Sequence, residues 1–340
     1  MIATTGFFDG VHSGHRLVLE RLVSLARSRG DESLVVTFWP HPRAVLQDGA
    51  RELRLLTTLE EKKALLLGLG VDRIEVLDFT RAFASLTAEQ YLRDILQSRL
   101  GVTTLVMGYD NRLGSDHLTA SALKPIAQKL DLELIQVEAL LGDMDLPEPV
   151  ATLGKTTPKI NRFSGAPESN PSRGPQLAVG GVVEDDGSGR FISPNIPVSS
   201  TKIRKALTEG RVEEAAAMLG YDYELKGVVV AGNRLGRTIG FPTANMKLYE
   251  PLKLIPGNGV YAVDVQVLGQ VYRGMTNIGM RPTVGGTATT IETHILDFDE
   301  DIYGLPLRIA FRRRIRDEVR FPSLEDLRNQ LEKDREACRA

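Results

Sequence analysis

The run TTGFFDGVHSGH at residues 4–15 places three glycines and two histidines close together, directly after a short β-prone stretch. Glycines let a backbone turn tightly and approach a bulky anion, and the start of a following helix offers unpaired N–H groups. His12 and His15 are three residues apart, so both imidazoles can face the same anion when a helix begins near Ser13. We therefore expect the phosphates of a nucleotide to bind at this turn.

The two histidines suit charge stabilisation during transfer of a nucleotidyl group. Their N–H groups can donate to the α-phosphate oxygens of ATP as charge moves to the leaving pyrophosphate, and losing one such donor costs roughly 10²–10³ in rate. Histidines near a helix start can instead simply cap the helix or lie on the surface. A metal site is less favoured, because nothing in the sequence brings His41 or His117 to the pair.

A second glycine-rich run, VVVAGNRLGRTIGFPTAN, lies at residues 228–245. Its backbone N–H groups can cradle phosphates, and the Thr243 hydroxyl and Asn245 carbonyl oxygen are hard ligands suited to Mg²⁺. It is not a Walker loop, because no Gly-Lys-Ser/Thr follows the glycines. The alternative interpretation is a flexible hairpin turn.

β-prone runs and helical patterns alternate over the first 140 residues, which contain the first motif. Repeated strand–helix–strand units predict a parallel sheet covered by helices. A helix is expected over 15–29, and capping boxes open two more at TLEEKKALLLG and TAEQYLRDILQSRLG. We expect five strands that are buried on both faces, at residues 2–6, 33–38, 72–77, 103–108 and 132–137.

The rest of the chain has a different pattern. Eight of the 17 prolines fall within 142–198, which predicts a linker or a long insertion. Two short helices follow, at SSTKIRKALTEG and VEEAAAMLG, and Ser323 is expected to cap a closing helix. From residue 223 the predicted strands lie close together, which favours an antiparallel sheet or small barrel. The run RRRIR at 312–316 is expected to be a solvated strand edge.

The composition is that of an ordinary globular protein with room for two domains in 340 residues. Because 42 basic and 44 acidic residues nearly balance, we expect no nucleic-acid partner. No signal-peptide pattern is present and no apolar run approaches the ~18 residues of a membrane span, so we expect no membrane partner. The single cysteine, Cys338, suits a reducing compartment, and the expected location is the cytoplasm. The oligomeric state stays open.

Five motifs, GFFDGVHSGH, TFWPHP, LLTTLEEK, GYDNRLG and SSTKIRKAL, occur in that order. Together they resemble the adenylyltransferase module of bifunctional riboflavin kinase/FAD synthetases, which are HxGH nucleotidyltransferases. The resemblance implies a Rossmann-like α/β fold, catalytic roles for His12 and His15, and a flavin contact at Asp110. It also implies that ATP is bound by Gly6, Phe7, Phe8, Gly14, Ser199, Ser200, Thr201 and Arg204. Taken alone, SSTKIR would indicate only an N-cap and a solvated helix face.

The strings GFPTAN, GVYAV, GMTNIGMRPTV, IETHILDFDEDIYG and IRDEVRF resemble riboflavin kinases. This resemblance implies a six-stranded antiparallel β-barrel with a C-terminal helix. It places the catalytic base at Glu292 and flavin contacts at Asn277 and Arg316. It implies that ATP is bound by Gly232, Gly236, Gly240, Phe241, Pro242, Thr243 and Asn245. Thr243 and Asn245 are the expected Mg²⁺ ligands.

The chemistry of phosphoryl transfer supports a base at Glu292. The 5′-hydroxyl of riboflavin must lose a proton as it attacks the γ-phosphate of ATP, and general-base help contributes roughly 10²–10⁴ in rate. The phosphate of FMN is already ionised near neutrality, so the adenylyl step needs no base. The alternative for Glu292 is a solvent-facing strand residue, with His294 on the same sheet face pairing across the strand.

Four segments are therefore expected: an adenylyltransferase domain at 1–141, the insertion at 142–198, a helical segment at 199–221 that completes the first site, and a kinase barrel at 222–340. The expected enzyme phosphorylates riboflavin to FMN and adenylylates FMN to FAD, with ATP and Mg²⁺ in both reactions. The alternatives are a kinase whose N-terminal module is degenerate, a non-catalytic flavin-binding protein, or another HxGH nucleotidyltransferase.

Overall fold

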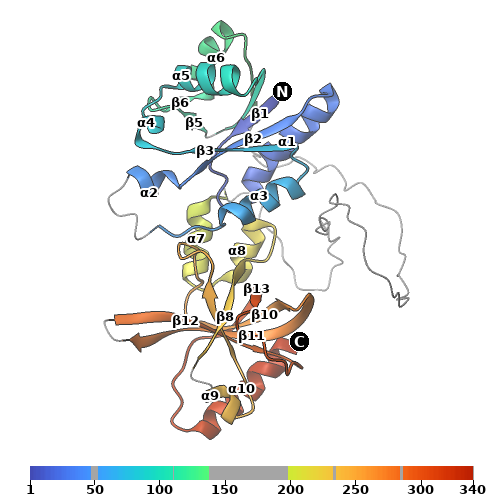
Figure 1. The fold of residues 1–340 in the computed structure, drawn as a ribbon, viewed down its shortest axis with the longest axis vertical. Coiled ribbons are helices and arrows are strands. Elements are labelled where there is room, and N and C mark those ends of the chain that lie inside the picture. Colours follow the sequence, from blue (N-terminus) through green and yellow to red (C-terminus); the bar gives the residue numbers. More distant parts are fainter. Residues whose placement is uncertain (47–52, 110, 138–197, 233–234, 284–285, 340) are drawn as a thin grey trace, which may run out of the picture.

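The computed structural model describes residues 1–46, 53–109, 111–137, 198–232, 235–283 and 286–339, and Figure 1 shows them as two stacked modules. The expected insertion at 142–198, apart from Val198, and the expected flavin residue Asp110 lie outside the described residues.

The N-terminal module is built on a parallel sheet, as the repeated strand–helix pattern predicts. The strands are paired in the order β3-β2-β1-β4-β7, and all the pairs are parallel. Their bounds are Ile2–Thr5 for β1, Ser33–Trp39 for β2, Arg73–Asp78 for β3, Thr104–Gly108 for β4 and Glu133–Val137 for β7. The expectation of five fully buried strands is wrong for the edge strands β3 and β7, which are mostly half-buried because each has a neighbour on one side only.

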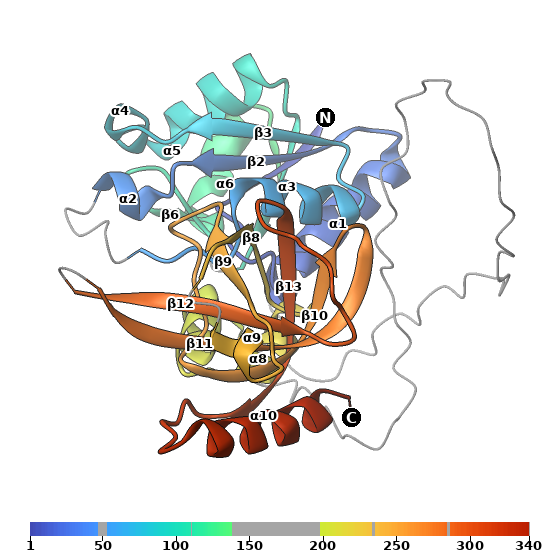
Figure 2. The ribbon, with the colours of Figure 1, turned by 60° about the horizontal axis from the view of Figure 1, so that its bottom comes forward.

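Helices cover both faces of this sheet, which gives three layers (Figure 2). On one face α1 (Ser13–Arg29) and α3 (Leu59–Gly68) pack on the sheet residues Ile2, Val35 and Val106. On the other lie α6 (Ala120–Lys129) and α5 (Ala88–Gln90), which runs on into a π-helix over Tyr91–Arg99. The capping boxes at Thr58 and Thr87 are confirmed. Four short elements complete the module: α2 (Pro42–Leu46), α4 (Arg81–Ala84), β5 (Arg112–Leu113) and β6 (Leu118–Thr119).

The C-terminal module is a closed six-stranded barrel with the strand order β10-β11-β12-β9-β8-β13. The strands are β8 (Glu224–Val230), β9 (Ala244–Leu248), β10 (Gly259–Val267), β11 (Gln270–Thr283), β12 (Gly286–Ile295) and β13 (Pro306–Arg316). The short helix α9 (Leu235–Thr238) precedes β9, and α10 (Leu324–Arg339) packs at the end of the barrel far from the parallel sheet (Figure 1). Strand β9 was not predicted, because its five residues directly follow a glycine-rich loop and the alternation of ANMKL is too short to separate it from that loop.

The run RRRIR is only in part the solvated edge that the sequence suggested: Arg312 and Arg313 are exposed and β8 pairs with β13 only as far as Ala310, but the other edge of the run is paired. Strand β10 pairs with β13 as far as Arg316, and the backbone N–H of Arg314 donates to Glu213 of the preceding helical segment at 3.1 Å. The Arg312 side chain binds two carboxylates, those of Asp222 and Asp264. The arginines of this run therefore take part in pairing and ion pairs that hold the barrel wall.

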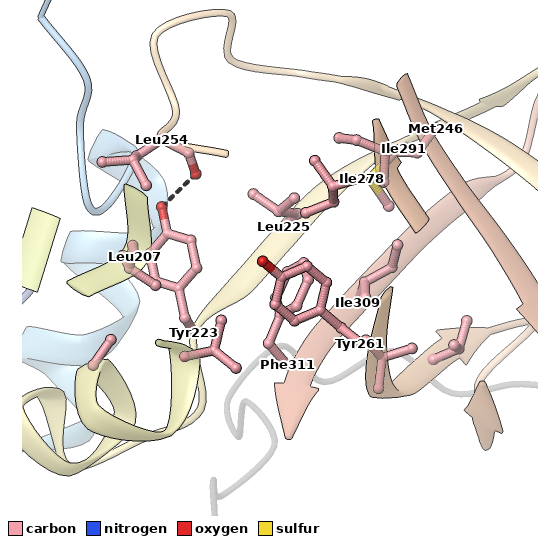
Figure 3. Packing of buried hydrophobic residues seen from close by; sticks show 14 of the residues in the cluster. Leu207, Tyr223, Leu225, Met246, Leu254, Tyr261, Ile278, Ile291, Ile309 and Phe311 are labelled. Atoms are coloured by element: carbon pink, nitrogen blue, oxygen red, sulfur yellow. Dashed lines mark hydrogen bonds between the residues drawn. The ribbon is translucent and has the colours of Figure 1, made fainter. Parts of the chain in front are cut away.

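Helices α7 (Ser200–Thr208) and α8 (Val212–Leu219) lie between the modules, and their apolar core is continuous with that of the barrel. Figure 3 shows Leu207 of α7 beside Tyr223, with Leu225, Ile309 and Phe311 further into the barrel. The Tyr223 hydroxyl donates to the backbone carbonyl of Leu254 at 2.8 Å. The two modules are therefore packed through a common core. In the described part of the chain, no helix is long and apolar enough to cross a membrane.

Candidate active sites

The backbone after β1 makes a strained turn before α1. Gly10 has φ +82°, and two non-glycine residues, Phe8 and Val11, also have positive φ values of +51° and +38°. Such conformations are costly for residues with a side chain and concentrate at functional sites. Gly6 and Gly14 have no positive φ. A Cβ at Gly6 would lie 3.1 Å from the Phe8 ring, and a Cβ at Gly14 would lie 3.3 Å from the His12 ring, so glycine leaves room for both rings.

The two histidines lie together at the first turn of α1. His12 is the N-cap residue, and its Nδ1 accepts from the backbone N–H of His15 at 3.4 Å. Their rings stack with centroids 3.7 Å apart and an interplanar angle of 16°. Burial, followed by the nearby His12 and Lys62, holds the pKa of His15 well below its usual value. His15 is therefore neutral at neutral pH, and its buried Nδ1 has no hydrogen-bond partner among the described residues.

A buried carboxylate that sequence reasoning missed organises this turn. Asp9 is 3% exposed and accepts hydrogen bonds from the backbone N–H groups of Leu56 and Thr57, at 3.1 and 3.0 Å, and from the Thr57 hydroxyl at 3.2 Å. It also binds the Arg204 guanidinium. The only sign of this role in the sequence was the place of Asp9 in a glycine-rich turn. An aspartate there is equally typical of a solvent-exposed turn residue.

Helix α7 brings the distant Ser-Ser-Thr motif to the same turn. Ser199 caps α7 by accepting from the backbone N–H of Lys202 at 3.4 Å, and the Ser200 hydroxyl donates to the Asp9 carbonyl at 3.1 Å. Arg204 binds the Asp9 carboxylate and donates to the Arg54 carbonyl at 2.9 Å. Thr201 is exposed on the first turn of the helix. The motif thus provides both the N-cap that its composition predicts and contacts to the turn.

A lysine that the sequence places on a helix is buried beneath the turn. Lys62, 2% exposed, donates through Nζ to the Phe7 carbonyl at 3.0 Å and to Thr37 Oγ1 at 2.9 Å. Burial lowers the pKa of Lys62 to about 8, although the charge of Asp9 raises it. Lys62 Nζ lies 4.2 Å from the centroid of the Phe7 ring, and the centroids of the Phe7 and His41 rings are 3.9 Å apart. Lys62 therefore supports the turn from below.

The remaining histidines do not complete a metal site with His12 and His15. His41 packs on Phe7, burial lowers its pKa to about 4, and His117 is exposed between β5 and β6. Across the residues that the structure describes, no three His, Cys, Asp or Glu side chains are grouped to hold a metal ion.

The barrel contains a cavity of about 500 Å³, a volume ordinary for a small-molecule site. Seven predicted residues line its wall: Gly236, Phe241, Thr243, Asn245, Asn277, Glu292 and Arg316. His294 lines it too. A second cavity of about 480 Å³ is lined by Pro242 and Thr243, so Thr243 borders both. Gly232 and Gly240 line neither cavity.

Sheet register brings the polar residues of the larger cavity together. Glu292 of β12 lies opposite Asn277 of β11 and opposite Asn245 of β9. Gly232 is required beside them, because a Cβ there would lie 2.2 Å from the Asn245 side-chain nitrogen. Glu292 is therefore flanked on both sides by asparagines that the resemblance had already singled out.

The Glu292 carboxylate is bound by an arginine that was not predicted. Arg281 Nη2 lies 2.6 Å from Glu292 Oε1, and both side chains line the cavity. His294 shares the sheet face of Glu292, as expected, and its Nδ1 lies 2.8 Å from the Pro242 carbonyl oxygen. Burial lowers the pKa of His294, so the ring is neutral and donates to this carbonyl. The string MRPT contained Arg281 but gave no sign of its partner.

The C-terminal helix fixes Arg316 at the cavity wall. Arg316 Nη2 lies 2.7 Å from an oxygen of Asp334, which is 1% exposed, and Gln330 donates to the same carboxylate at 2.9 Å. Asp334 was not predicted, because its position in a charged helical sequence resembles that of a solvated residue.

Two histidines at a helix N-terminus in one module, and a carboxylate in a cavity of the other, are arrangements that suit a transferase acting on nucleotides. Residues 1–145 match the family described as FAD synthetase, and residues 219–340 match the family described as riboflavin kinase.

Relatives match over the whole chain. The bifunctional riboflavin kinase/FMN adenylyltransferase of Listeria monocytogenes is 34% identical over 340 residues, which cover 100% of this chain and 91% of the relative. That of Escherichia coli K12 is 34% identical, with 98% and 90% covered. A crystal structure titled macrolide-efflux protein from Streptococcus pneumoniae is 31% identical, covers 99% of this chain and 93% of that chain, and has a TM-score of 0.79.

The chain belongs to the bifunctional riboflavin kinase/FMN adenylyltransferase family. It phosphorylates riboflavin to FMN and adenylylates FMN to FAD, with ATP as the co-substrate of both reactions. The fold, the family and the pair of activities that the sequence motifs predicted are confirmed.

Proposed function

We propose that the two reactions use separate sites, FMN adenylylation at the turn that carries His12 and His15 and riboflavin phosphorylation in the larger barrel cavity. One observation carries the proposal: donors gather at the first site, where the attacking phosphate is already ionised, and a carboxylate lies in the second, where a hydroxyl must lose a proton. The proposed module boundaries are 1–141 with 199–221 for the first site and 222–340 for the second, with 142–198 joining them.

In the kinase site, riboflavin occupies the larger cavity with its ribityl chain near Glu292. The nucleotide occupies the second cavity, and Thr243, which borders both, lies where its phosphates meet the flavin hydroxyl. Glu292 then accepts the proton of the 5′-hydroxyl as the hydroxyl attacks the γ-phosphate. Arg281 must release Glu292 for this step, and its freed guanidinium lies beside the incoming phosphate charge. Asn277 and Arg316 contact the flavin from the same wall.

Magnesium fits the oxygen ligands of this site. Thr243 and Asn245 are two residues apart on one cavity wall, and their hydroxyl and carbonyl oxygens are the hard donors that Mg²⁺ prefers. A bound Mg²⁺ would neutralise the charge of the transferring phosphate. Phe241 and the glycines of the preceding loop shape the backbone that leads to these two ligands.

In the adenylyltransferase site, the phosphate of FMN attacks the α-phosphate of ATP and pyrophosphate leaves. His12, His15 and Arg204 supply donors or charge to the reacting phosphates, and neutral His15 donates without giving up a proton. The backbone of Gly6, Phe7, Phe8 and Gly14, and the hydroxyls of Ser199, Ser200 and Thr201, complete the proposed ATP contacts. Asp110 is the proposed flavin contact. The co-substrate ATP and the single cysteine support a cytoplasmic location.

The test is a time course with purified protein, riboflavin and Mg-ATP, in which chromatography resolves the flavins. FMN should rise first and FAD should follow it. FMN that accumulates without FAD would support a kinase-only protein, and bound riboflavin without any product would support a carrier.

A further inference from the structure

One short segment of the N-terminal module, residues 53–57, is paired with the barrel module. The backbone N–H of Leu55 donates to the Leu252 carbonyl at 2.8 Å, and the N–H of Leu254 donates to the Leu55 carbonyl at the same distance. Leu55 and Lys253 form an isolated parallel bridge. Residues 252–254 follow β9, the strand that carries Asn245. Backbone pairing therefore joins the two modules at this point.

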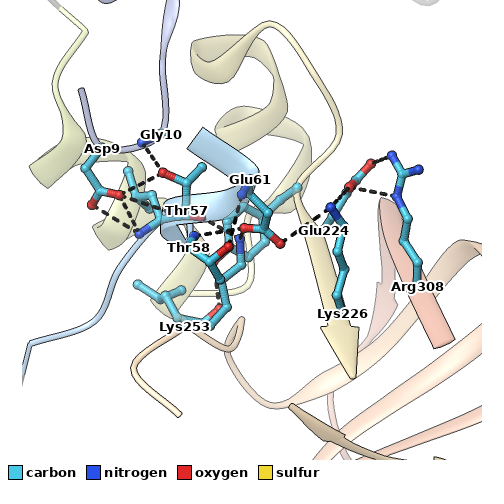
Figure 4. A network of polar contacts seen from close by, with 12 residues as sticks. Asp9, Gly10, Thr57, Thr58, Glu61, Glu224, Lys226, Lys253 and Arg308 are labelled. Carbon is cyan, nitrogen blue, oxygen red and sulfur yellow. Dashed lines mark hydrogen bonds and ion pairs between the residues drawn. The ribbon is translucent and has the colours of Figure 1, made fainter. Parts of the chain in front are cut away.

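Lys253 makes charge-assisted hydrogen bonds across this junction. It is 4% exposed, and its Nζ donates to the Leu56 carbonyl and to Glu61 Oε2, each at 2.6 Å. The same Glu61 oxygen accepts from the backbone N–H of Thr58 at 3.0 Å and so caps α3. One buried ammonium thus fixes the carbonyl of Leu56 and the start of the helix that follows it. Figure 4 shows these contacts continuing from Glu61 toward Lys226 and the barrel wall.

The opposite side of the segment belongs to the adenylyltransferase site. The backbone N–H groups of Leu56 and Thr57 donate to the Asp9 carboxylate, and the Thr57 hydroxyl accepts from the backbone N–H of Gly10 at 3.1 Å (Figure 4). Asp9 binds Arg204. Leu56 therefore donates its N–H to the turn that leads to His12 and offers its carbonyl to a lysine of the barrel.

We infer that Lys253, a residue of the kinase module, is a positioning residue for FMN adenylylation: it holds the peptide of Leu56 so that Asp9 and Arg204 keep their places. This inference rests on the proposed location of adenylylation at the histidine turn. The chain of contacts is Lys253 to Leu56, Leu56 to Asp9, and Asp9 to Arg204. Each link is a hydrogen bond or ion pair to a buried or half-buried group, so a shift at one end is transmitted rather than absorbed by solvent.

The chain offers a matched control in Lys226. It lies on β8, 3.9 Å from the other oxygen of Glu61, and its side chain is 39% exposed. The described contacts of Lys226 include no bond to the 53–57 segment, whereas Lys253 bonds to Leu56. Lys226→Met removes a cation near Glu61 without removing the hydrogen bond to Leu56.

The experiment compares Lys253→Met, Lys226→Met and the double variant Lys253→Met/Glu61→Gln, with FMN supplied for the adenylyl assay and riboflavin for the kinase assay. The double variant leaves no unpaired buried carboxylate, so its adenylylation rate can be measured even if Lys253→Met alone folds poorly. In both Lys253 variants kcat/KM for ATP in FMN adenylylation should fall by about ten- to a hundredfold, because a reacting group misplaced by a fraction of an ångström is costly. Riboflavin phosphorylation should keep its wild-type rate, and Lys226→Met should leave both reactions unchanged.

A double-mutant cycle separates positioning from simple module docking. In an Asp9→Asn background the path is already broken, so adding Lys253→Met should reduce adenylylation little further. The inference would be overturned if the losses from Asp9→Asn and Lys253→Met multiplied, or if Lys253→Met/Glu61→Gln kept the wild-type rate of adenylylation. An effect of Lys226→Met as large as that of Lys253→Met, or an equal fall in kinase activity, would overturn it as well. Failure of the proposed site is distinguishable, since in that case His12→Ala would itself leave FAD synthesis intact.

Discussion

Asp9 and Arg204 form an ion pair between positions 195 residues apart in the chain, one in the turn after β1 and the other on α7. Asp9 is buried and the Arg204 side chain is 20% exposed; Nη2 of the arginine binds Asp9 and its Nε donates to the Arg54 carbonyl. The carboxylate accepts from two backbone N–H groups and a hydroxyl as well. Asp9 therefore both shapes the turn and orients the cation.

Asp9→Asn should lower FMN adenylylation by about a hundredfold, because the amide presents N–H groups to backbone donors and Arg204 loses its counter-ion. Riboflavin phosphorylation should be unaffected, since the barrel cavity is in the other module. Rates of both reactions, measured on the same preparation, check this. Asp78→Asn, an exposed change at the end of β3, is the control. Equal losses in the two reactions would show that Asp9 is needed for folding and not for the site.

Much of the fold was predictable from the sequence. The central strands β1, β2 and β4 are short apolar runs, and α3 opens with a capping box, so local pattern and tertiary position agree. Strand β9 was missed because it has only five residues and directly follows a loop rich in turn residues. The π-helix over Tyr91–Arg99 was missed because its apolar spacing is compatible with an α-helix.

The candidate sites were predictable only where a motif marked them. The histidine pair and Glu292 were predicted from strings of several residues. Asp9, Lys62 and Arg281 lie inside the quoted motifs too, but their residue types alone did not mark them, and Asp334 lies in no motif. Their roles depend on partners far away in the chain, as Lys62 depends on the Phe7 carbonyl. No local pattern encodes such a contact, since it exists only after the chain folds.

His12→Ala should reduce FAD synthesis by about 10²–10³ through loss of a phosphate donor, while riboflavin phosphorylation continues. The same change removes the N-cap of α1 and so also lowers the stability of the helix. His12→Asn separates the two causes, because asparagine caps a helix well and has no imidazole. Initial rates of FAD formation from FMN and ATP should be low in both variants. A normal rate in His12→Asn would show that the histidine serves only as a cap.

Glu292→Gln should slow riboflavin phosphorylation by about 10²–10⁴ through loss of the general base, and it should leave adenylylation of supplied FMN intact. Glutamine has the same shape and can still accept from Arg281, so the barrel should remain folded. Single-turnover measurements with saturating riboflavin isolate the chemical step from binding. Glu325→Gln, on the exposed first turn of α10, is the matched control. Phosphorylation at the wild-type rate in Glu292→Gln would exclude the carboxylate as the base.

Asp334→Asn should weaken riboflavin binding without touching FMN adenylylation, because Asp334 holds Arg316 at the cavity wall from α10. Breaking a buried ion pair from one side also destabilises a protein by about 3–5 kcal/mol. The measurements are KM for riboflavin and denaturant unfolding. Glu336→Gln, on the same helix but 66% exposed, should change neither. An unchanged KM with reduced stability would restrict Asp334 to a structural role.

Lys62 gives the protein a distinct pH dependence of stability. Burial lowers its pKa from the ordinary 10.5 to about 8 in the folded chain. Between pH 8 and pH 10.5 the unfolded chain therefore binds more protons at this lysine than the folded chain does, and stability must rise with pH over that window. Below pH 8 the buried ammonium is charged in both states and its full desolvation cost is present.

Lys62→Met removes this titration. The free energy of unfolding of the wild type relative to Lys62→Met should therefore increase by about 1–3 kcal/mol from pH 7 to pH 10, an increment that reflects Lys62 alone because all other groups titrate in both proteins. Urea unfolding at several pH values measures the difference, and Lys63→Met, a neighbouring lysine paired with Glu60 at 3.0 Å on the surface, should show no such trend. A constant difference across the range would mean that Lys62 keeps its ordinary pKa and that its ammonium is hydrated despite its position under the turn.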